Sequence, residues 1–279
     1  MTITEREFVL DKASYLEFSH LMAQVLGYAP TVFDQLLPTW HWLFTHGTPL
    51  GVKLGTDGHP EARPPGVPKH FVRRLWTDSV IKCGAAEIEF GQVLRLRAEV
   101  GQAILKQGRS GELAFVPTKL SLSSGESAVL QETRTGVYRS VPPPTNRSKV
   151  ADSAKRRVGK AELSVSKAIS FNEVDLFRYS ALLKVYHRIH YDAAYATVEE
   201  GHPGLLVHGP LLGQALIAHA LSQHPGFCVS NVAVSVRRPI YVNRVVYLCV
   251  HFDAASNFIN ATALNEQLHL AMTIELDGA

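Results

Sequence analysis

The chain reads Tyr179-Ser-Ala-Leu-Leu-Lys-Val-Tyr-His-Arg-Ile-His-Tyr-Asp-Ala-Ala-Tyr-Ala-Thr197 and then, after a short gap, Gly204-Leu-Leu-Val-His-Gly-Pro-Leu-Leu-Gly213. This stretch brings together His187, His190, Asp192 and His208, and it places Gly209 at the predicted start of an apolar helix. A polar cluster that leads into a helix N-terminus is suited to moving a proton and to holding a developing negative charge. We therefore expect an enzyme.

The composition is that of a globular protein with a substantial core. The chain has 279 residues, enough for one large domain or two of ordinary size, and 46% of them are apolar while 19% are charged. A formal net charge of +3 is too small to indicate a nucleic-acid partner. The basic run Lys155-Arg-Arg157 is interpreted as a solvated patch; the alternative is that it lies near the phosphates of coenzyme A.

The sequence also bears on the compartment. Its three cysteines, Cys83, Cys228 and Cys249, are widely spaced in apolar surroundings, which indicates buried free thiols and neither a zinc site nor a disulfide framework. The N-terminus has acidic residues and lacks the arginine-rich character of a transit peptide, and no apolar run reaches membrane-spanning length. We expect a cytoplasmic protein with no membrane partner.

A proline-rich and then charged segment divides the chain. It begins at Val141-Pro-Pro-Pro144, and its composition predicts a linker over residues 141–160 between an N-terminal unit (1–140) and a C-terminal unit (161–279). Apolar periodicity predicts a helix over 12–26, capped by Asp11, and a short helix over 31–36. In the C-terminal unit it predicts helices over 172–183 and 207–221.

Runs of alternating polarity predict the strands. They lie at 76–82, 85–90, 93–106, 112–124, 127–139, 161–170, 228–239, 244–252, 258–264 and 267–276. The stretch Lys106-Gln-Gly-Arg-Ser-Gly111 is typical of a β-hairpin link. A helix beside a run of antiparallel strands, twice over, predicts two α+β units.

Several short motifs together resemble one protein family. They are Leu37-Pro-Thr-Trp-His-Trp-Leu43, Asp57-Gly-His-Pro60, Arg73-Arg-Leu-Trp76, Gly108-Arg-Ser-Gly111, Val137-Tyr-Arg139, Tyr179-Ser-Ala-Leu182, His187-Arg-Ile-His-Tyr-Asp192, Tyr195-Ala196 and Pro203-Gly-Leu-Leu-Val-His-Gly209. The chain resembles the two-unit members of the MaoC-like (hydratase 2) hot-dog family, namely the type 2 hydroxyacyl-thioester dehydratases and the mesaconyl-coenzyme A hydratases. The resemblance runs from about residue 35 to the end.

The resemblance implies a double hot-dog fold of the α+β class, in which each unit has an antiparallel sheet wrapped around a central helix. It implies an acyl-thioester substrate, carried by coenzyme A or acyl carrier protein, and a reaction that interconverts 3-hydroxyacyl and enoyl thioesters without metal or other cofactor. The first unit is then a degenerate one, because residues 1–140 contain no His-x-x-His-x-Asp element. A monomer and a homodimer both remain open.

Two residues match the family's catalytic positions. His190 matches the catalytic histidine, and an imidazole with an ordinary pKa of about 6.5 can serve as acid or base near neutrality. Gly209 matches the residue whose backbone N–H faces the thioester carbonyl, where the absent side chain and the helix dipole favour an enolate oxygen.

One position departs from the family pattern. The family has Asp or Asn five residues before the catalytic histidine, where this chain has Val185. Three explanations are open: Tyr186, His187 or Tyr191 substitutes; water is handled by the substrate or by His190 alone; or the enzyme performs another proton shift, such as double-bond isomerisation. We place the dehydratase/hydratase first.

The remaining polar residues near His190 have structural interpretations beside the functional ones. His208 is expected to be a hydrogen-bonded residue at the helix start, and Asp192 to orient its loop, although both stay candidates for substrate contact together with His187. His202, His219, His224 and His269 have no partner evident from spacing. The alternative classes are a non-catalytic acyl-thioester-binding module and a thioesterase.

Overall fold

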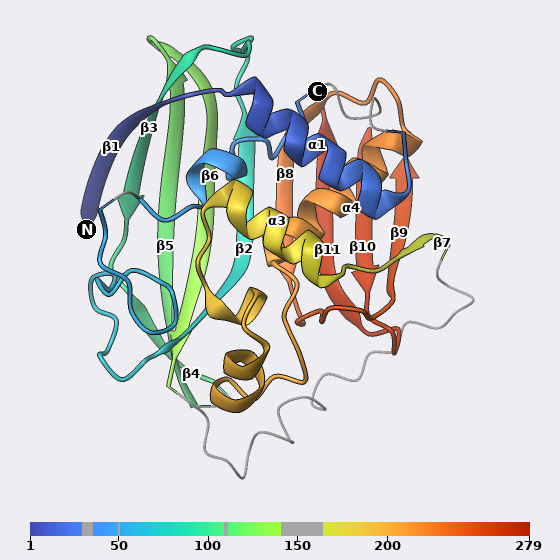
Figure 1. Cartoon of the computed structure of the whole chain (residues 1–279). Helices are drawn as coiled ribbons and strands as arrows, with labels where there is room; N and C mark the ends of the chain where they lie inside the picture. Colours follow the sequence, from blue (N-terminus) through green and yellow to red (C-terminus); the bar gives the residue numbers. More distant parts are fainter. Residues whose placement is uncertain (30–35, 50, 109–110, 141–163) are drawn as a thin grey trace. The chain divides into compact units, whose positions relative to one another are not determined.

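The computed structural model describes residues 1–29, 36–49, 51–108, 111–140 and 164–279 (Figure 1). Nearly all of the predicted short helix at 31–36, and all of the predicted linker at 141–160, lie outside these residues. Contacts group the chain into two compact units. The first comprises Met1–Leu10, Ala62–Arg156 and Ser230–Val236; the second comprises Asp11–Glu61, Arg157–Val229 and Arg237–Ala279. The contiguous domain boundaries expected from the sequence remain a prediction.

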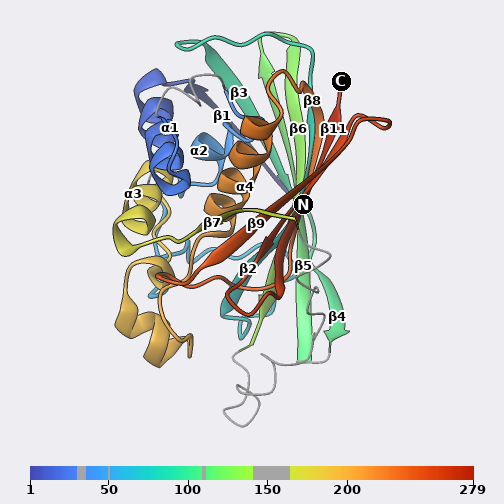
Figure 2. The same ribbon diagram turned by 90° about the vertical axis from the view of Figure 1, so that its right-hand side faces the viewer.

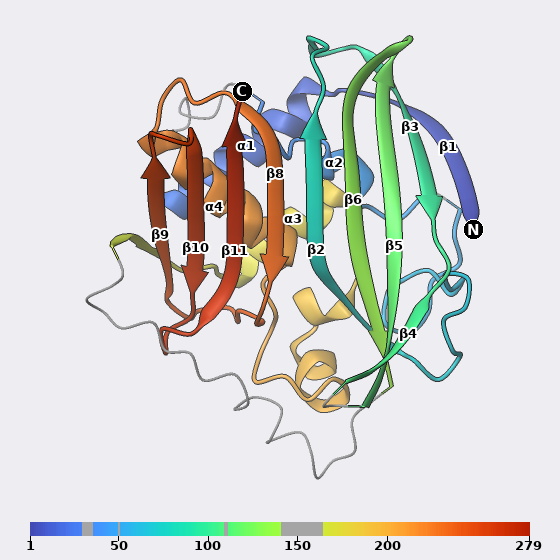
Figure 3. The same cartoon turned by 180° about the vertical axis from the view of Figure 1, so that it is seen from behind.

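The first unit is an antiparallel sheet with the strand order β1-β3-β5-β6-β2-β8, and β4 pairs with the first residues of β5 (Figure 3). Its strands are β1 (Thr2–Val9), β2 (Arg73–Cys83), β3 (Val93–Val100), β4 (Ile104–Gly108), β5 (Gly111–Ser124), β6 (Ser127–Arg139) and β8 (Val229–Val236). A small core of Val67, Phe71, Ala114 and Val116 packs under one end. Among its described residues this unit has no helix.

Three features of this sheet differ from the predicted strands. β1 was not predicted; its mostly exposed residues pair with β3 along the whole strand, and the exposed ion pairs Arg97–Glu5 (2.7 Å) and Arg95–Glu7 (3.5 Å) also join the two strands. The strand predicted at 93–106 breaks at Gly101. The Gly101 N–H donates to Pro117 O, and a Cβ added at Gly101 would lie 2.9 Å from the Pro117 ring. Residues 85–90 alternate in polarity but form no strand.

The second unit packs helices on a four-stranded antiparallel sheet of order β11-β10-β9-β7 (Figures 1 and 2). The strands are β7 (Val165–Ile169), β9 (Val246–Asp253), β10 (Phe258–Leu264) and β11 (Leu270–Gly278). The helices are α1 (Lys12–Leu26), α2 (Trp42–Thr45), α3 (Glu173–Leu183) and α4 (Gly209–Gln223). The bounds predicted for α1 are confirmed, and Asp11 caps it by accepting from Ser14 N at 2.7 Å. By its contacts this helix groups with the second unit.

Helix α4 is the centre of the second unit. Ten of its residues are buried, from Leu211 to Ala220, because it contacts β10 and β11 on one side and α1 on another (Figure 2). Its start is defined by His208 as N-cap and by Pro210 in the first turn, where the missing proline N–H costs nothing. Gln214 is fully buried: it accepts from Tyr179 Oη (2.6 Å) and donates to Thr39 O (3.0 Å).

The three cysteines are free. Cys249 is buried and Cys83 half-buried, whereas Cys228 is exposed, so the expectation of three buried thiols is wrong for Cys228. Among the described residues, no helix has both the length and the apolar character that crossing a membrane requires.

Candidate active site

The site forms where two backbone segments of the second unit lie against each other. Leu206 N donates to Ile189 O at 3.0 Å, which joins the segment carrying His190 to the segment that leads into α4. On its other side the second segment is held by Val207 N to Ile240 O (2.9 Å) and Val242 N to Leu205 O (3.0 Å). His190 itself ends a short 3₁₀ turn, η4 (Arg188–His190). These bonds bring His190 beside the start of α4.

The hydrogen bonding of His190 determines its tautomer. Its Nδ1 lies 2.9 Å from Leu206 O, and because a carbonyl only accepts, Nδ1 must carry the proton. Among the described residues no hydrogen bond reaches Nε2. Burial lowers the pKa of His190 to about 4, with smaller contributions from the charges that His59 and His202 can carry. At neutral pH the ring is therefore neutral, with a lone pair on Nε2.

The ring of His190 stacks on the ring of His208. Their centroids are 3.6 Å apart and their planes differ by 18°. His208 is the N-cap of α4, and its Nε2 lies 2.8 Å from Ser180 Oγ, while its buried Nδ1 has no hydrogen-bond partner among the described residues. Burial, then the neighbouring His190 and His187, lower the pKa of His208 well below its usual range. The expected helix-start role of His208 agrees with this geometry.

Gly209 is the first residue of α4, directly after His208. The first amides of a helix lack intrahelical acceptors and carry the positive end of the dipole. Because His190 stacks on the preceding residue, its ring and this helix start are neighbours in space. The sequence prediction that these two groups belong to one site is consistent with the geometry, and their catalytic roles remain a prediction.

A fourth histidine, which sequence reasoning passed over, joins this group. His59 lies 4.3 Å, centroid to centroid, from His187, and His187 lies 5.5 Å from His190. We call His59, His187, His190 and His208 the histidine cluster. His187 is buried (7% exposed), whereas His59 keeps partial exposure. The motif Asp57-Gly-His-Pro60 was the available signal, but no periodicity links it to a segment more than a hundred residues later.

The other predicted candidates surround the cluster. Tyr186 and Tyr191 are exposed (40% and 47%), and Tyr191 Oη donates to Tyr186 O at 3.0 Å. Asp192 is fully engaged: Oδ1 accepts from Tyr195 N (2.9 Å) and Oδ2 from Arg188 (2.7 Å). The Tyr195 N–H and then the Arg188 guanidinium lower the pKa of Asp192. Asp192 therefore braces the loop before the short π-helix η5 (Tyr195–Glu199), and Val185 is half-buried near the end of α3.

The described residues contain no group of three or more His, Cys, Asp or Glu arranged to bind a metal. His190 and His208 stack face to face and do not point at a common centre. The metal-independence that the resemblance implies remains a prediction.

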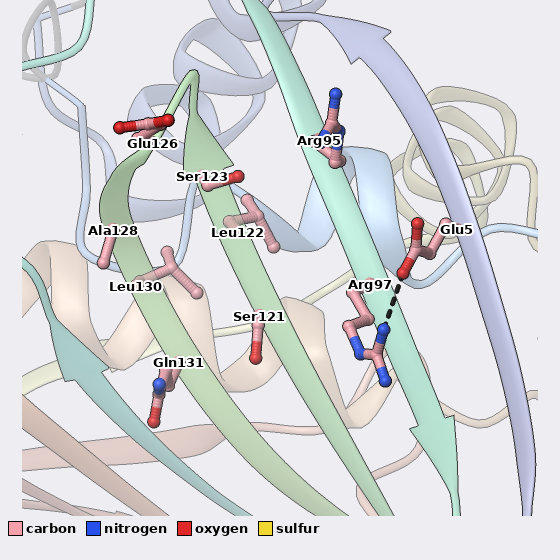
Figure 4. Close-up of a pocket in the computed structure, with 10 residues that line it drawn as sticks. All are labelled: Glu5, Arg95, Arg97, Ser121, Leu122, Ser123, Glu126, Ala128, Leu130 and Gln131. Carbon is pink, nitrogen blue, oxygen red and sulfur yellow. Dashed lines mark hydrogen bonds and ion pairs between the residues drawn. The ribbon is translucent and has the colours of Figure 1, made fainter.

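A pocket of different character lies within the first unit, on β1, β3, β5 and β6 (Figure 4). Two of its charged residues are engaged with neighbours: Arg97 binds Glu5 and Glu99, and Arg95 pairs with Glu7. Its lining contains no histidine or cysteine, and it shares no residue with the histidine cluster. We assign it no role in the chemistry.

Known proteins resemble this chain along most of its length. A model of the hydroxyacyl-thioester dehydratase type 2 family matches residues 39–242. Mesaconyl-C(4)-CoA hydratase of Chloroflexus aurantiacus is 33% identical over 256 residues, covering 90% of this chain and 87% of that protein. The mitochondrial hydroxyacyl-thioester dehydratase type 2 of Schizosaccharomyces pombe is 24% identical over 273 residues, covering 86% and 88%.

Solved structures show the same fold. A MaoC-like dehydratase from Phytophthora capsici aligns with a TM-score of 0.70 at 12% identity, covering 100% of this chain and 95% of that one. HtdX of Mycobacterium tuberculosis aligns with a TM-score of 0.63 at 16% identity, covering both chains fully. The fold is the α+β double hot-dog, as the sequence predicted. Because the family model matches more than half of the sequence, the chain belongs to the hydroxyacyl-thioester dehydratase type 2 family and is a hydro-lyase.

Proposed function

We propose that the enzyme interconverts 3-hydroxyacyl and enoyl thioesters by removing or adding water, with His190 transferring the α-proton and the Gly209 N–H stabilising the enolate. One observation supports this most directly. His190 is neutral and presents an unprotonated Nε2 beside the N-terminus of α4. A base next to a helix start provides the two functions that an enolate-forming step requires.

The reaction follows from these groups. In dehydration, Nε2 of His190 takes the α-proton, and the electron pair of the broken C–H bond moves onto the thioester oxygen near the Gly209 amide. The enolate then collapses to the α,β-double bond as the β-hydroxyl leaves and is protonated to water. Hydration is the reverse. The cluster is built for this role because Leu206 O fixes the tautomer and His208 fixes the ring plane.

The substrate class is proposed from the relatives. One relative is named for mesaconyl-C(4)-CoA, and the other for hydroxyacyl thioesters. We infer a short acyl chain on coenzyme A as the first substrate to try, and an acyl-carrier-protein thioester as the second.

A second candidate reaction is favoured by one residue. Val185 has an aliphatic side chain at the position where the family has Asp or Asn, so it can neither position water nor protonate a leaving hydroxyl. A site with His190 and Gly209 alone could shift a double bond without adding water.

The test uses the whole chain with crotonyl-CoA and mesaconyl-C(4)-CoA. Hydration removes the enoyl absorbance, and we expect the wild-type enzyme to do this while His190→Ala is at least a hundred-fold slower with nearly unchanged thermal stability. Deuterium incorporation from D₂O with retained enoyl absorbance would identify the proton-shift reaction instead. Equal rates for wild type and His190→Ala would contradict the proposal, and release of free thiol would indicate a thioesterase.

A further inference from the structure

The proposed reaction needs a second proton-transferring group, and the sequence position expected to supply it is occupied by Val185. Water addition requires one group at the α-carbon and another at the β-oxygen. With a pKa near 4, His190 is neutral at pH 7, and its Nε2 then carries no proton to give to a leaving hydroxyl. A second proton-transferring group must therefore lie beside His190.

His59 is the polar side chain whose position fits this role. Its ring packs on His187, which in turn meets His190 edge to face, so the three imidazoles form a connected row. His187 is almost fully buried, whereas His59 is only partly buried. His59 is thus near His190 and accessible to a small molecule, a combination that His187 lacks.

The segment that carries His59 is built as a tight hairpin. Gly55 N donates to His59 O (2.7 Å), Glu61 N donates to Lys53 O (2.9 Å), and Leu54 bridges to Pro60. Inside the turn, Asp57 Oδ1 accepts from His59 N at 3.0 Å. The backbone around His59 is therefore fixed at several points.

The hairpin is docked on the backbone next to His187. Arg188 N donates to Asp57 O and Arg188 Nη1 donates to Thr56 O, both at 3.0 Å. At Gly58 (φ +85°) an added Cβ would lie 1.7 Å from Tyr186 O, so only glycine permits this approach. The same segment that places His187 and His190 thus places His59.

We propose that His59 is the second catalytic residue, in direct contact with the β-oxygen, and that His187 is a positioning residue for it. This inference rests on the proposed hydratase function. In dehydration, protonated His59 gives its proton to the departing hydroxyl while His190 takes the α-proton; the two rings end with exchanged charges and return through solvent. In hydration, neutral His59 takes a proton from the attacking water and protonated His190 delivers one to the α-carbon.

The test compares His59→Gln with His251→Gln, which changes an exposed histidine on β9. We expect His59→Gln to lower kcat for hydration by about 100-fold or more, in the range of general acid–base catalysis, and His251→Gln to leave it within about two-fold. Exchange of the α-protons of butyryl-CoA with D₂O needs only His190 and Gly209, so His59→Gln should retain it. A merely structural role would reduce both readouts together and would overturn the proposal.

A second variant tests the same idea by rescue. Val185→Asp in the His59→Gln background restores a carboxyl group at the position where the family has one, and we expect hydration to recover at least ten-fold. Absence of recovery, together with parallel loss of α-proton exchange, would overturn the His59 assignment. An active wild type with an equally active His59→Gln would overturn this inference alone. A wild type inert toward all thioesters would overturn the proposed function, and His59 with it.

Discussion

Two histidines of the second unit, the half-buried His190 and the buried His219, have nearly the same pKa and very different surroundings. Burial lowers the pKa of both His190 and His219 to about 4. His219, in the middle of α4, has both ring nitrogens occupied: Nδ1 lies 2.6 Å from Tyr28 Oη and Nε2 lies 2.7 Å from Ser166 Oγ. His190 has one nitrogen bonded and the other available. Desolvation thus explains the lowered pKa of both rings, whereas the available nitrogen separates the proposed catalytic ring of His190 from the structural ring of His219.

The largest expected effect comes from substituting His190 and His219 in turn. His190→Gln removes the proposed base, and we expect kcat/KM for hydration to fall by about 10²- to 10⁴-fold. His219→Gln should leave kcat/KM within about three-fold but lower the free energy of unfolding, because buried polar partners lose their hydrogen bonds. Steady-state kinetics and urea unfolding of both variants check this. Comparable losses of activity in the two variants would remove the distinction.

The pH dependence of catalysis sharpens the same contrast. With a pKa of about 4, His190 keeps its Nε2 lone pair down to that pH, and below it the protonated ring can no longer act as base. For dehydration, the direction in which His190 acts as the base, we expect the acidic limb of kcat/KM near pH 4, not near the ordinary value of about 6.5. Rates from pH 3.5 to 8 in a constant-ionic-strength buffer would show it, provided that circular dichroism reports a folded protein at each pH. A limb near 6.5 that persists in His59→Gln would contradict this assignment.

A third test compares two glycines that share positive φ values. A Cβ added at Gly58 (φ +85°) would clash with Tyr186 O. A Cβ added at Gly91 (φ +90°) would have no other atom within 4 Å. Gly91→Ala should cost about 1 kcal/mol of stability from backbone strain alone. Gly58→Ala should cost more and also lower hydration at least ten-fold, because the hairpin carrying His59 must move. Unfolding curves and kcat measured side by side decide this; equal behaviour of the two variants would mean that the close approach at Gly58 is unimportant.

The smallest effect concerns the structural histidine. Tyr28→Phe removes the hydroxyl beside Nδ1 of His219, and we expect a loss of about 1–2 kcal/mol with unchanged kcat. Tyr247→Phe is the matched control, since that hydroxyl makes no hydrogen bond within the described residues. Because the folded pKa of His219 is lowered, stability should fall as pH drops below about 6.5, where the unfolded chain gains a proton that the folded ring resists. A pH-independent unfolding free energy over this window would argue against the lowered pKa.

Features with a strong local signal could be predicted from the sequence. The amphipathic helix α1 and its Asp11 cap follow from periodicity, and α4 from its apolar run after Gly209. β1 could not be predicted because it is a mostly exposed edge strand without a buried face, paired with a strand far along the sequence. At residues 85–90 the alternation of polar and apolar residues was not enough to predict structure, because these residues do not pair with a neighbouring strand.

The site was predictable only in part for a related reason. His190, His208 and Gly209 are close in sequence and lie in two neighbouring motifs, so their proximity could be expected. His59 reaches them through a hairpin whose docking depends on the backbone of Tyr186 and Arg188, and no spacing rule encodes such a contact. The partners of His219 were missed for the same reason, since Tyr28 is 191 positions away.

The central claim is that His190 is neutral at physiological pH, with its proton on Nδ1 and Nε2 available to substrate. Long-range ¹H–¹⁵N spectra of the uniformly labelled protein report the tautomer and protonation state of each histidine, with His190 assigned by the signals lost in His190→Gln. We predict the Nδ1–H tautomer at pH 7, a titration midpoint near pH 4, and a shift of the Nε2 resonance when a non-reactive acyl-CoA is added. An Nε2–H tautomer, or an imidazolium that titrates near 6.5 and does not respond to the thioester, would contradict the account.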